Sequence, residues 1–266
     1  MPRPLQSGTI RPSQRGFSLV ELMIAMLIAL FLLGGLVTLV MGTRKTSATQ
    51  SSLSQLQDNQ RIAMTLITNV VQKAGYFPDP TTQDLNTFAA EAALATVALP
   101  AGQVLGGTYT AAAPGDTFLA RFYAPQNDTN GTVIDCAGQS NTTGSATVWY
   151  TNAFLVGTDT KGNPWLQCQS RTSGGGTVLT INLVPNVKQI SVLYGVSSNA
   201  AGDDYSVVQY LNASQMTATK WLNVTAVKVT LTFLVPNYGM TGGQMTTNTT
   251  TFTRVIPMMS RAGVNT

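Results

Sequence analysis

Glu21 is the residue that most needs a chemical partner, because its charged side chain lies within an apolar run that continues to Met41. A carboxylate inside a lipid-embedded helix costs at least about 2.5–3.5 kcal/mol, so it needs a partner of opposite charge. Phe17 stands four residues earlier and directly follows Gly16. Cleavage between Gly16 and Phe17 would create an α-amine one helical turn from the carboxylate. The spacing therefore offers Glu21 an ammonium group as its partner.

Catalytic chemistry finds little support elsewhere in the chain. There is no histidine, which removes the commonest general base and metal ligand. Ser and Thr are plentiful, but no His is present to activate them as nucleophiles. No P-loop, paired-acid site or nucleophile motif stands out. We therefore expect no enzymatic activity, no cofactor and no resident metal.

The two cysteines, Cys136 and Cys168, form no C-x-x-C pattern. In an exported domain, two isolated cysteines are most simply explained by one disulfide. The alternative is a pair of buried free thiols in a reducing compartment. The disulfide between Cys136 and Cys168 is the preferred interpretation.

The formal charge of +4 is unevenly distributed. Lys and Arg number 15 against 11 Asp and Glu, and three of the cations (Arg3, Arg11 and Arg15) precede Phe17. Without these three the balance is 12 against 11, so the basic character belongs largely to residues 1–16. The near-neutral remainder argues against nucleic acid as a partner.

The segment that follows Glu21 has the dimensions of a membrane helix. Residues 22–40 carry no charge and would form roughly 28 Å of helix, enough to cross a hydrocarbon core. A secretory signal would place a shorter apolar core before a small-residue cleavage site, whereas here Gly16 precedes the apolar run. A cut after Gly16 would discard residues 1–16 and keep the helix. An uncleaved signal anchor is the alternative, but it leaves Glu21 unexplained.

The segment Gly16-Phe17-Ser18-Leu19-Val20-Glu21 resembles the class III signal of type IV pilins and type II pseudopilins. In that family a prepilin peptidase cuts after the glycine and methylates the new N-terminal Phe. The resemblance implies cleavage between Gly16 and Phe17 and N-methylation of Phe17. It also implies a role in subunit assembly for Glu21, which becomes the fifth mature residue.

The helix should continue well beyond the membrane. No Pro or Gly occurs between Thr43 and Ala74, after which Gly75 and Pro78 supply a C-cap and a stop. Apolar residues recur on one side at about 100° per residue, interrupted by Gln60. They are Leu53, Leu56, Ala63, Met64, Ile67, Val70, Val71 and Ala74. We predict one helix from Phe17 to Ala74, whose second half packs against a sheet.

Two pairs of residues in this helix leave alternatives open. Ile62 and Leu66 point away from the apolar stripe, so either the sheet wraps further round the helix or a neighbouring subunit contacts them. Gly34 and Gly35 each cost about 1 kcal/mol relative to Ala in a helix interior. They permit close helix packing in the membrane, or they mark a point at which the helix bends.

Beyond Pro80 the pattern changes to short strand-like runs separated by Gly, Asn, Thr and Ser. Strands are predicted at residues 117–123, 147–156, 177–183, 188–194, 205–211, 224–235 and 250–256. The Ala-rich residues 86–99 and the segment from Asn212 to Trp221, with Asn212 as N-cap, are predicted as short helices.

These elements predict an α+β fold, in which a long N-terminal helix packs on a mainly antiparallel sheet. The predicted organisation has four parts. They are a cleaved leader (1–16), the membrane-spanning half of the helix (17–41), its amphipathic half (42–77) and a globular head (78–266).

Three further stretches sharpen the resemblance. Gln57–Met64 with Val71–Phe77, Val187–Val196 and Trp221–Val229 resemble the helix end, the "LYG" strand and the following Trp-x-x-Val strand of PilW-type minor pilins. GspJ-type pseudopilins share the general plan. The loop after the LYG strand is often Asp-rich in the family, but residues 197–205 hold two carboxylates here. We therefore prefer an ordinary turn to a calcium site at this position.

The resemblance implies a minor type IV pilin that helps to initiate pilus assembly, in a tip complex with other minor pilins. Its implied partners are other minor pilins, the major pilin, the prepilin peptidase, the inner-membrane assembly platform and a large tip adhesin. The alternatives are a GspJ-like pseudopilin of type II secretion and a pilin-like adhesin subunit.

The implied location is the inner membrane, crossed once with the N-terminus in the cytoplasm and the head in the periplasm, and later the pilus and the cell surface. Loop charge agrees weakly with this orientation. Three arginines precede the span, whereas Arg44 and Lys45 follow it.

Overall fold

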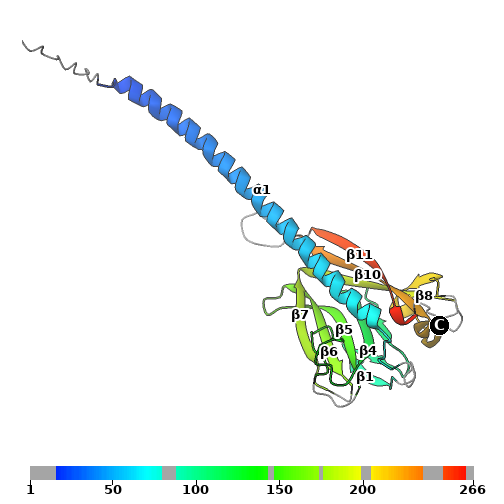
Figure 1. Ribbon diagram of the computed structural model, residues 1–266. Helices are drawn as coiled ribbons and strands as arrows, with labels where there is room; N and C mark the ends of the chain where they lie inside the picture. Colours follow the sequence, from blue (N-terminus) through cyan, green and yellow to red (C-terminus); the bar gives the residue numbers. More distant parts are fainter. Residues whose placement is uncertain are drawn as a thin grey trace, which may run out of the picture. The chain divides into compact units, whose positions relative to one another are not determined.

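The structure, a computed structural model, describes residues 16–79, 88–142, 147–173, 176–198, 205–235 and 248–261. The chain forms two structural units, residues 1–50 and 51–266. The helix α1, Leu19–Lys73, contributes its first part to the former unit and its last part to the latter. The head belongs to the second unit, and the α+β fold predicted from the sequence is confirmed (Figure 1).

The C-terminal end of α1 follows its sequence signals. Gly75 has φ 76°, a left-handed conformation that glycine adopts without steric cost. Its backbone N–H donates to the carbonyl of Arg121 (2.9 Å), and the N–H of Tyr76 donates to the carbonyl of Lys73 (2.8 Å). The helix therefore ends one residue before the predicted Ala74, and the cap ties it directly to the sheet.

The buried face of α1 is close to the predicted stripe but not identical to it. The buried helical residues are Ser52, Leu56, Ala63, Met64, Ile67, Val70 and Val71. The prediction for Leu53 is wrong, because its side chain is 47 % exposed. Ile62 is also exposed, at 46 %, so the sheet does not wrap round to cover it.

The described part of the head contains two larger antiparallel sheets and a small hairpin (Figure 1). One sheet has the order β3-β4-β5-β6-β7, and the other has the order β11-β10-β8-β9. The first sheet comprises β3 Leu105–Thr108, β4 Thr117–Ala124, β5 Val148–Thr158, β6 Pro164–Thr172 and β7 Leu179–Pro185. The second comprises β8 Val187–Val196, β9 Gln209–Leu211, β10 Val224–Leu234 and β11 Thr249–Pro257. The hairpin is β1 Glu91–Leu94 with β2 Val97–Leu99.

The core lies between the two sheets and the second part of α1. Strand β8 contacts β4, β5 and β6 of the other sheet, and side chains from all three layers belong to one hydrophobic cluster. The alternation predicted for β10 is confirmed, because Val227, Val229, Leu231 and Phe233 are fully buried. The intervening residues of β10 are half-exposed, as expected for a strand with one face on the core.

Asp116 joins the two sheets through its side chain and backbone. Its carboxylate accepts the backbone N–H groups of Thr110 (2.8 Å) and Val192 (2.7 Å), and its own N–H donates to the carbonyl of Ile190 (2.8 Å). The carboxylate is buried, so these bonds compensate its desolvation. Both sheets are thus fixed to each other at the start of β4.

The helix predicted at residues 86–99 is wrong. Residues 86 and 87 lie outside the described residues, and the segment that follows forms the β1–β2 hairpin with Ala95 and Thr96 at positive φ. The carboxylate of Glu91 explains the outcome. It accepts hydrogen bonds from Arg171 Nε (3.0 Å), Trp149 Nε1 (3.2 Å) and the Thr151 hydroxyl. These tertiary bonds outweigh the helix propensity of alanine, which is the highest of any residue but is worth only a few tenths of a kcal/mol per residue, about the scale of the differences between ordinary residues.

The buried Arg121 holds the same segment from the other side. Its guanidinium donates to the carbonyls of Gln103 (2.6 Å), Ala89 (2.6 Å) and Pro100 (2.7 Å), and it lies 4.9 Å from the centre of the Phe88 ring. Burial lowers the pKa of Arg121 to about 10, an effect opposed by nearby Glu91. The arginine stays charged at neutral pH and anchors the hairpin.

Other local differences concern boundaries and two missed strands. Strands β3 and β6 were not predicted, because β3 contains Gly106 and Gly107 and β6 alternates polar residues with few apolar ones. The strand predicted at residues 205–211 is reduced to β9. The predicted helix 212–221 is split into a 3-10 turn, Ala213–Gln215, and a short helix α2, Ala218–Leu222, capped by Thr217. The turn predicted at residues 197–205 falls mostly outside the described residues.

Candidate functional site

The residues predicted for processing and assembly lie at the start of α1. Gly16, Phe17 and Ser18 precede the helix, and the carbonyl of Ser18 accepts the backbone N–H groups of Glu21 (3.0 Å) and Leu22 (3.2 Å). Glu21 therefore lies in the first helical turn. A carboxylate is favoured there by the partial positive charge of the helix N-terminus.

Glu21 is exposed and forms no salt bridge with any described residue. The Phe17 side chain is 83 % exposed. In the uncleaved chain the nitrogen of Phe17 belongs to a peptide bond and carries no charge. Among the described residues, the intact chain therefore supplies no cation to this carboxylate. The exposed carboxylate is accessible to a cation from another source.

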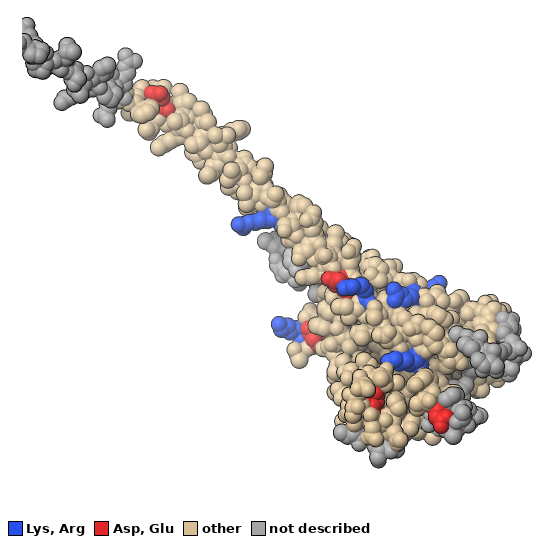
Figure 2. Space-filling model, in the orientation of Figure 1, with Lys and Arg blue, Asp and Glu red and all other residues tan. Residues whose placement is uncertain are grey.

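The helix after Glu21 presents apolar side chains in every direction. All large apolar residues from Phe17 to Met41 are exposed, and the helix contains a window of mean hydropathy 2.7 of which none is buried. Figure 2 shows this part of the helix as a long uncharged surface between one acidic group near its start and the first basic groups. By length and composition the helix is able to cross a membrane.

Threonine hydroxyls in this segment are satisfied within the helix itself. Thr38 donates to the carbonyl of Gly35 (2.8 Å), and Thr43 donates to the carbonyl of Leu39 (2.8 Å). These bonds remove the need for water at the hydroxyl groups. These two threonines are therefore compatible with an apolar environment.

Gly34 and Gly35 do not interrupt α1, which is helical through both residues. A Cβ placed on either glycine would meet nothing within 4 Å. The described residues thus supply no contact that requires glycine here. Both alternatives for these glycines, close packing of another helix and a point at which the helix bends, stay predictions.

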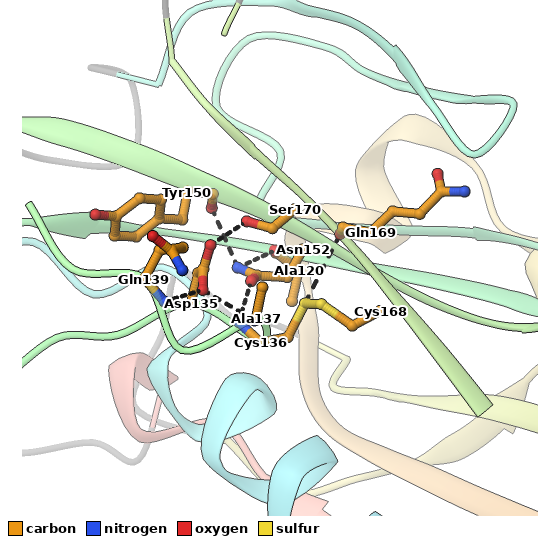
Figure 3. The surroundings of a disulfide bond; sticks show 10 residues. All are labelled: Ala120, Asp135, Cys136, Ala137, Gln139, Tyr150, Asn152, Cys168, Gln169 and Ser170. Carbon is orange, nitrogen blue, oxygen red and sulfur yellow. Dashed lines mark hydrogen bonds between the residues drawn. A yellow bond between two sulfur atoms is a disulfide. The ribbon is translucent and has the colours of Figure 1, made fainter. Parts of the chain in front are cut away.

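In the head, the predicted disulfide is confirmed between Cys136 and Cys168 (Figure 3). Cys168 lies in β6, and Cys136 lies in the loop between β4 and β5, with 6.0 Å between their Cα atoms. The Asn152 side chain accepts the N–H of Cys136 (2.7 Å). Closing a loop of this length stabilises the folded state by about 3–4 kcal/mol in the chain-entropy model.

Three turns in the head share one pattern that the sequence analysis missed. In each, an Asp is followed three residues later by a glycine at positive φ whose N–H donates to the carbonyl of that Asp. The carboxylate also accepts the N–H of the residue after the glycine. The turns are Asp128–Thr132, Asp135–Gln139 and Asp159–Asn163. Asp-x-x-Gly is the signal that would have revealed them.

These bonds favour the ionised aspartates. The N–H groups of Val133 and Thr132, with the Thr132 hydroxyl, hold the pKa of Asp128 below its usual value, and Lys73 adds to the effect. The pKa of Asp159 is lowered to about 2, first through the side chain and N–H of Asn163. Asp128 and Asp159 are therefore ionised at neutral pH.

Metal binding has no support in the described part of the chain. No group of three His, Cys, Asp or Glu residues is placed there to hold an ion. Glu91, Asp116 and Asp135 accept hydrogen bonds from protein groups instead.

The two strands that carry the head resemblance are neighbours in space. Strands β8 and β10 pair with Val227 opposite Tyr194. The rings of Tyr194 and Trp221 meet edge-to-face at 4.6 Å, and the buried Tyr194 hydroxyl donates to the carbonyl of Gly106 (3.2 Å). The Trp and LYG stretches therefore form one packed unit.

Comparisons with known protein families found a match in the N-terminal segment and a match in the head. Residues 153–257 match the family described as Type IV Pilus-assembly protein W. Residues 11–37 match the prokaryotic N-terminal methylation motif, which contains Gly16, Phe17 and Glu21. No curated protein sequence matches the chain. Together with the apolar N-terminal helix and the antiparallel head, the two matches support a PilW-type minor pilin.

Proposed function

We propose that the protein is made as an inner-membrane precursor, with residues 1–16 in the cytoplasm and the head in the periplasm. A prepilin peptidase cuts between Gly16 and Phe17 and methylates the new amine of Phe17. The mature chain then leaves the membrane and joins other minor pilins at the filament tip, where it helps to initiate assembly. Its role is association with other pilus components, without catalysis of its own.

One observation carries this proposal: the segment from Phe17 to Met41 exposes all its large apolar side chains around a carboxylate that has no ion-pair partner among the described residues. An apolar surface of this kind needs lipid or other helices to cover it. A carboxylate in the same surroundings needs a cation. A bundle of identical or related pilin helices, each with a free N-terminal amine, provides both.

In the assembled filament Glu21 would accept the ammonium group of a neighbouring subunit's Phe17. The amine of its own chain, one helical turn away, is the competing partner. Either pairing requires the cut after Gly16, because before cleavage no amine exists at Phe17. Processing therefore precedes assembly in this proposal.

The test replaces Glu21 by alanine in the full-length protein. We expect Glu21→Ala to leave cleavage largely intact, as measured by the size and N-terminal sequence of the mature chain, and to abolish its incorporation into sheared pili. Asp58→Ala is a matched control, because Asp58 is an exposed acid on the same helix whose ion pair with Arg61 is exposed. Normal incorporation of Glu21→Ala would refute the pairing role.

Deletion of the gene separates the pilus from type II secretion. A PilW-type role predicts loss of pili and of twitching motility, with protein export unchanged. A GspJ-like pseudopilin would give the opposite result. An N-terminal sequence that begins at Met1, or after the apolar helix, would overturn the processing step itself.

A further inference from the structure

A pocket of about 300 Å³ opens beside the loop that the disulfide holds. Its walls come from the loop after Cys136, from β5 and β6, and from the start of β7. Among the described residues that line it, Asp135 is the charged one and Leu179 the apolar one, and the others bear neutral hydroxyl or amide groups. The pocket is separate from the N-terminal segment that directs processing and assembly.

The side chain of Tyr150 is the most informative part of the lining. It is 3 % exposed, and its hydroxyl makes no hydrogen bond to any described residue. Figure 3 shows this hydroxyl pointing away from Asp135 and the disulfide. Burial, with added effects of Asp135 and Asp128, raises the pKa of Tyr150 to about 12. The hydroxyl is therefore a protonated donor at neutral pH. It is not among the fully buried side-chain atoms that lack a partner, so it is accessible from the pocket that Tyr150 lines.

Asp135, by contrast, is occupied by the protein. Its carboxylate accepts the Ser170 hydroxyl and the N–H groups of Ala137 (2.9 Å) and Gln139 (2.7 Å) (Figure 3). These bonds hold the loop in place. Because they occupy the carboxylate oxygens, Asp135 is a poor cation ligand. Since no Lys or Arg is among the described lining residues, the pocket also lacks the charge that an anion would need.

The loop wall of the pocket is already held in place. The disulfide fixes Cys136 to β6, Asn152 accepts its N–H, and the N–H of Asp128 donates to the carbonyl of Asn141 (2.8 Å). Binding here would not need to order the loop, which lowers the entropic cost of association.

We propose that this pocket binds a neutral, hydroxyl-rich ligand with the size and chemistry of a monosaccharide unit. The Tyr150 hydroxyl donates to a ligand oxygen on the pocket floor. The side chains of Gln139 and Thr172 at the rim both donate and accept, as sugar hydroxyls require. Leu179, 40 % exposed, offers an apolar contact to one face of the sugar ring. The proposal does not depend on the processing and assembly proposed above.

The test uses the full-length protein in a detergent without a sugar headgroup, because glycosidic detergents would compete. Glucose, galactose, mannose and N-acetylglucosamine are titrated separately, and binding is followed by saturation-transfer NMR. We expect saturable binding of at least one sugar, and Tyr150→Phe should weaken it by roughly 3- to 10-fold through loss of one hydrogen bond. Tyr109→Phe, at an exposed tyrosine outside the pocket, is the matched control and should bind like the unmodified protein.

Three results would overturn the proposal. They are the absence of saturable binding of all four sugars up to ~100 mM, equal affinity of Tyr150→Phe, and displacement of the sugar by inorganic phosphate. Near-UV circular dichroism checks that Tyr150→Phe is folded. If that variant does not fold, Thr172→Val at the half-exposed rim takes its place, with the same expected weakening.

Discussion

Residues 19–47 and residues 52–73 belong to one helix, yet their apolar side chains meet different surroundings. In the second stretch one stripe is buried by the head, and the other positions are polar or exposed. In the first stretch the helix is exposed throughout, and from Leu22 to Met41 it is apolar on all sides. An apolar pattern on one side of a helix is covered within the chain, whereas an apolar pattern on all sides requires lipid or other subunits to cover it.

The largest expected effect is the loss of stability when a buried side chain of the second stretch is truncated, compared with the same kind of truncation in the exposed first stretch. Ile67→Ala removes a fully buried side chain and should lower the free energy of unfolding of the head by about 2–5 kcal/mol. Leu27→Ala in the exposed stretch should change it by less than about 0.5 kcal/mol. Urea unfolding followed by tryptophan fluorescence measures both. Similar losses for the two variants would contradict the division of the helix.

Glycine substitutions should act with opposite sign in the two regions. Gly75 at the end of the covered stretch has φ 76°, so Gly75→Ala is expected to destabilise the head by about 1 kcal/mol. Gly35 is helical with open space around it, so Gly35→Ala should favour the helix by about 0.5–1 kcal/mol. Urea unfolding measures the first variant, and helicity in detergent by far-UV circular dichroism measures the second.

The smallest expected effect is a difference between the two regions in their response to acid pH. Residues 22–43 contain no titratable side chain, whereas the head holds aspartate turns such as that of Asp159. Because the folded pKa of Asp159 is lowered from 3.8 to about 2, its stabilising contribution is complete above about pH 4 and is lost as the pH falls towards 2. Acid should therefore weaken the head and leave the helicity of residues 22–43 unchanged.

Asp159→Asn provides the control for this titration. The variant should lose less stability than the unmodified head between pH 4 and pH 2, as measured by urea midpoints at each pH. An identical acid response of the two proteins would show that the Asp159 turn does not contribute.

The elements predicted best were those whose pattern is local and long. The extent of α1, its end at Gly75 and the alternation of β10 follow from side-chain periodicity and a single capping glycine. Leu53 failed because the buried face of the helix passes through Ser52 and Leu56 and leaves Leu53 to one side. Strand β6 was missed because its inward positions include Cys168 and Ser170, which are polar or small but become buried by pairing.

The candidate sites divide in the same way. Gly16, Phe17 and Glu21 form a contiguous signal whose spacing along one helix is visible without a structure. The pocket is assembled from residues far apart in the chain, such as Asp135, Tyr150 and Leu179. Their proximity depends on the strand order β5-β6-β7 and on the disulfide. Neither can be read from a short segment of the sequence.

The sequence by itself determined the long apolar helix, its lone carboxylate, the α+β class and the resemblance to PilW-type pilins, because these depend on composition, period and local spacing. Only the tertiary structure decided that residues 91–99 form a hairpin, that Leu53 and Ile62 stay exposed and that Tyr150 lines a pocket together with Asp135 and Leu179. The physical reason is that burial and hydrogen-bond satisfaction depend on which distant groups meet. Three donors converging on Glu91 outweigh a local preference of a few tenths of a kcal/mol per residue, about the scale of helix propensity.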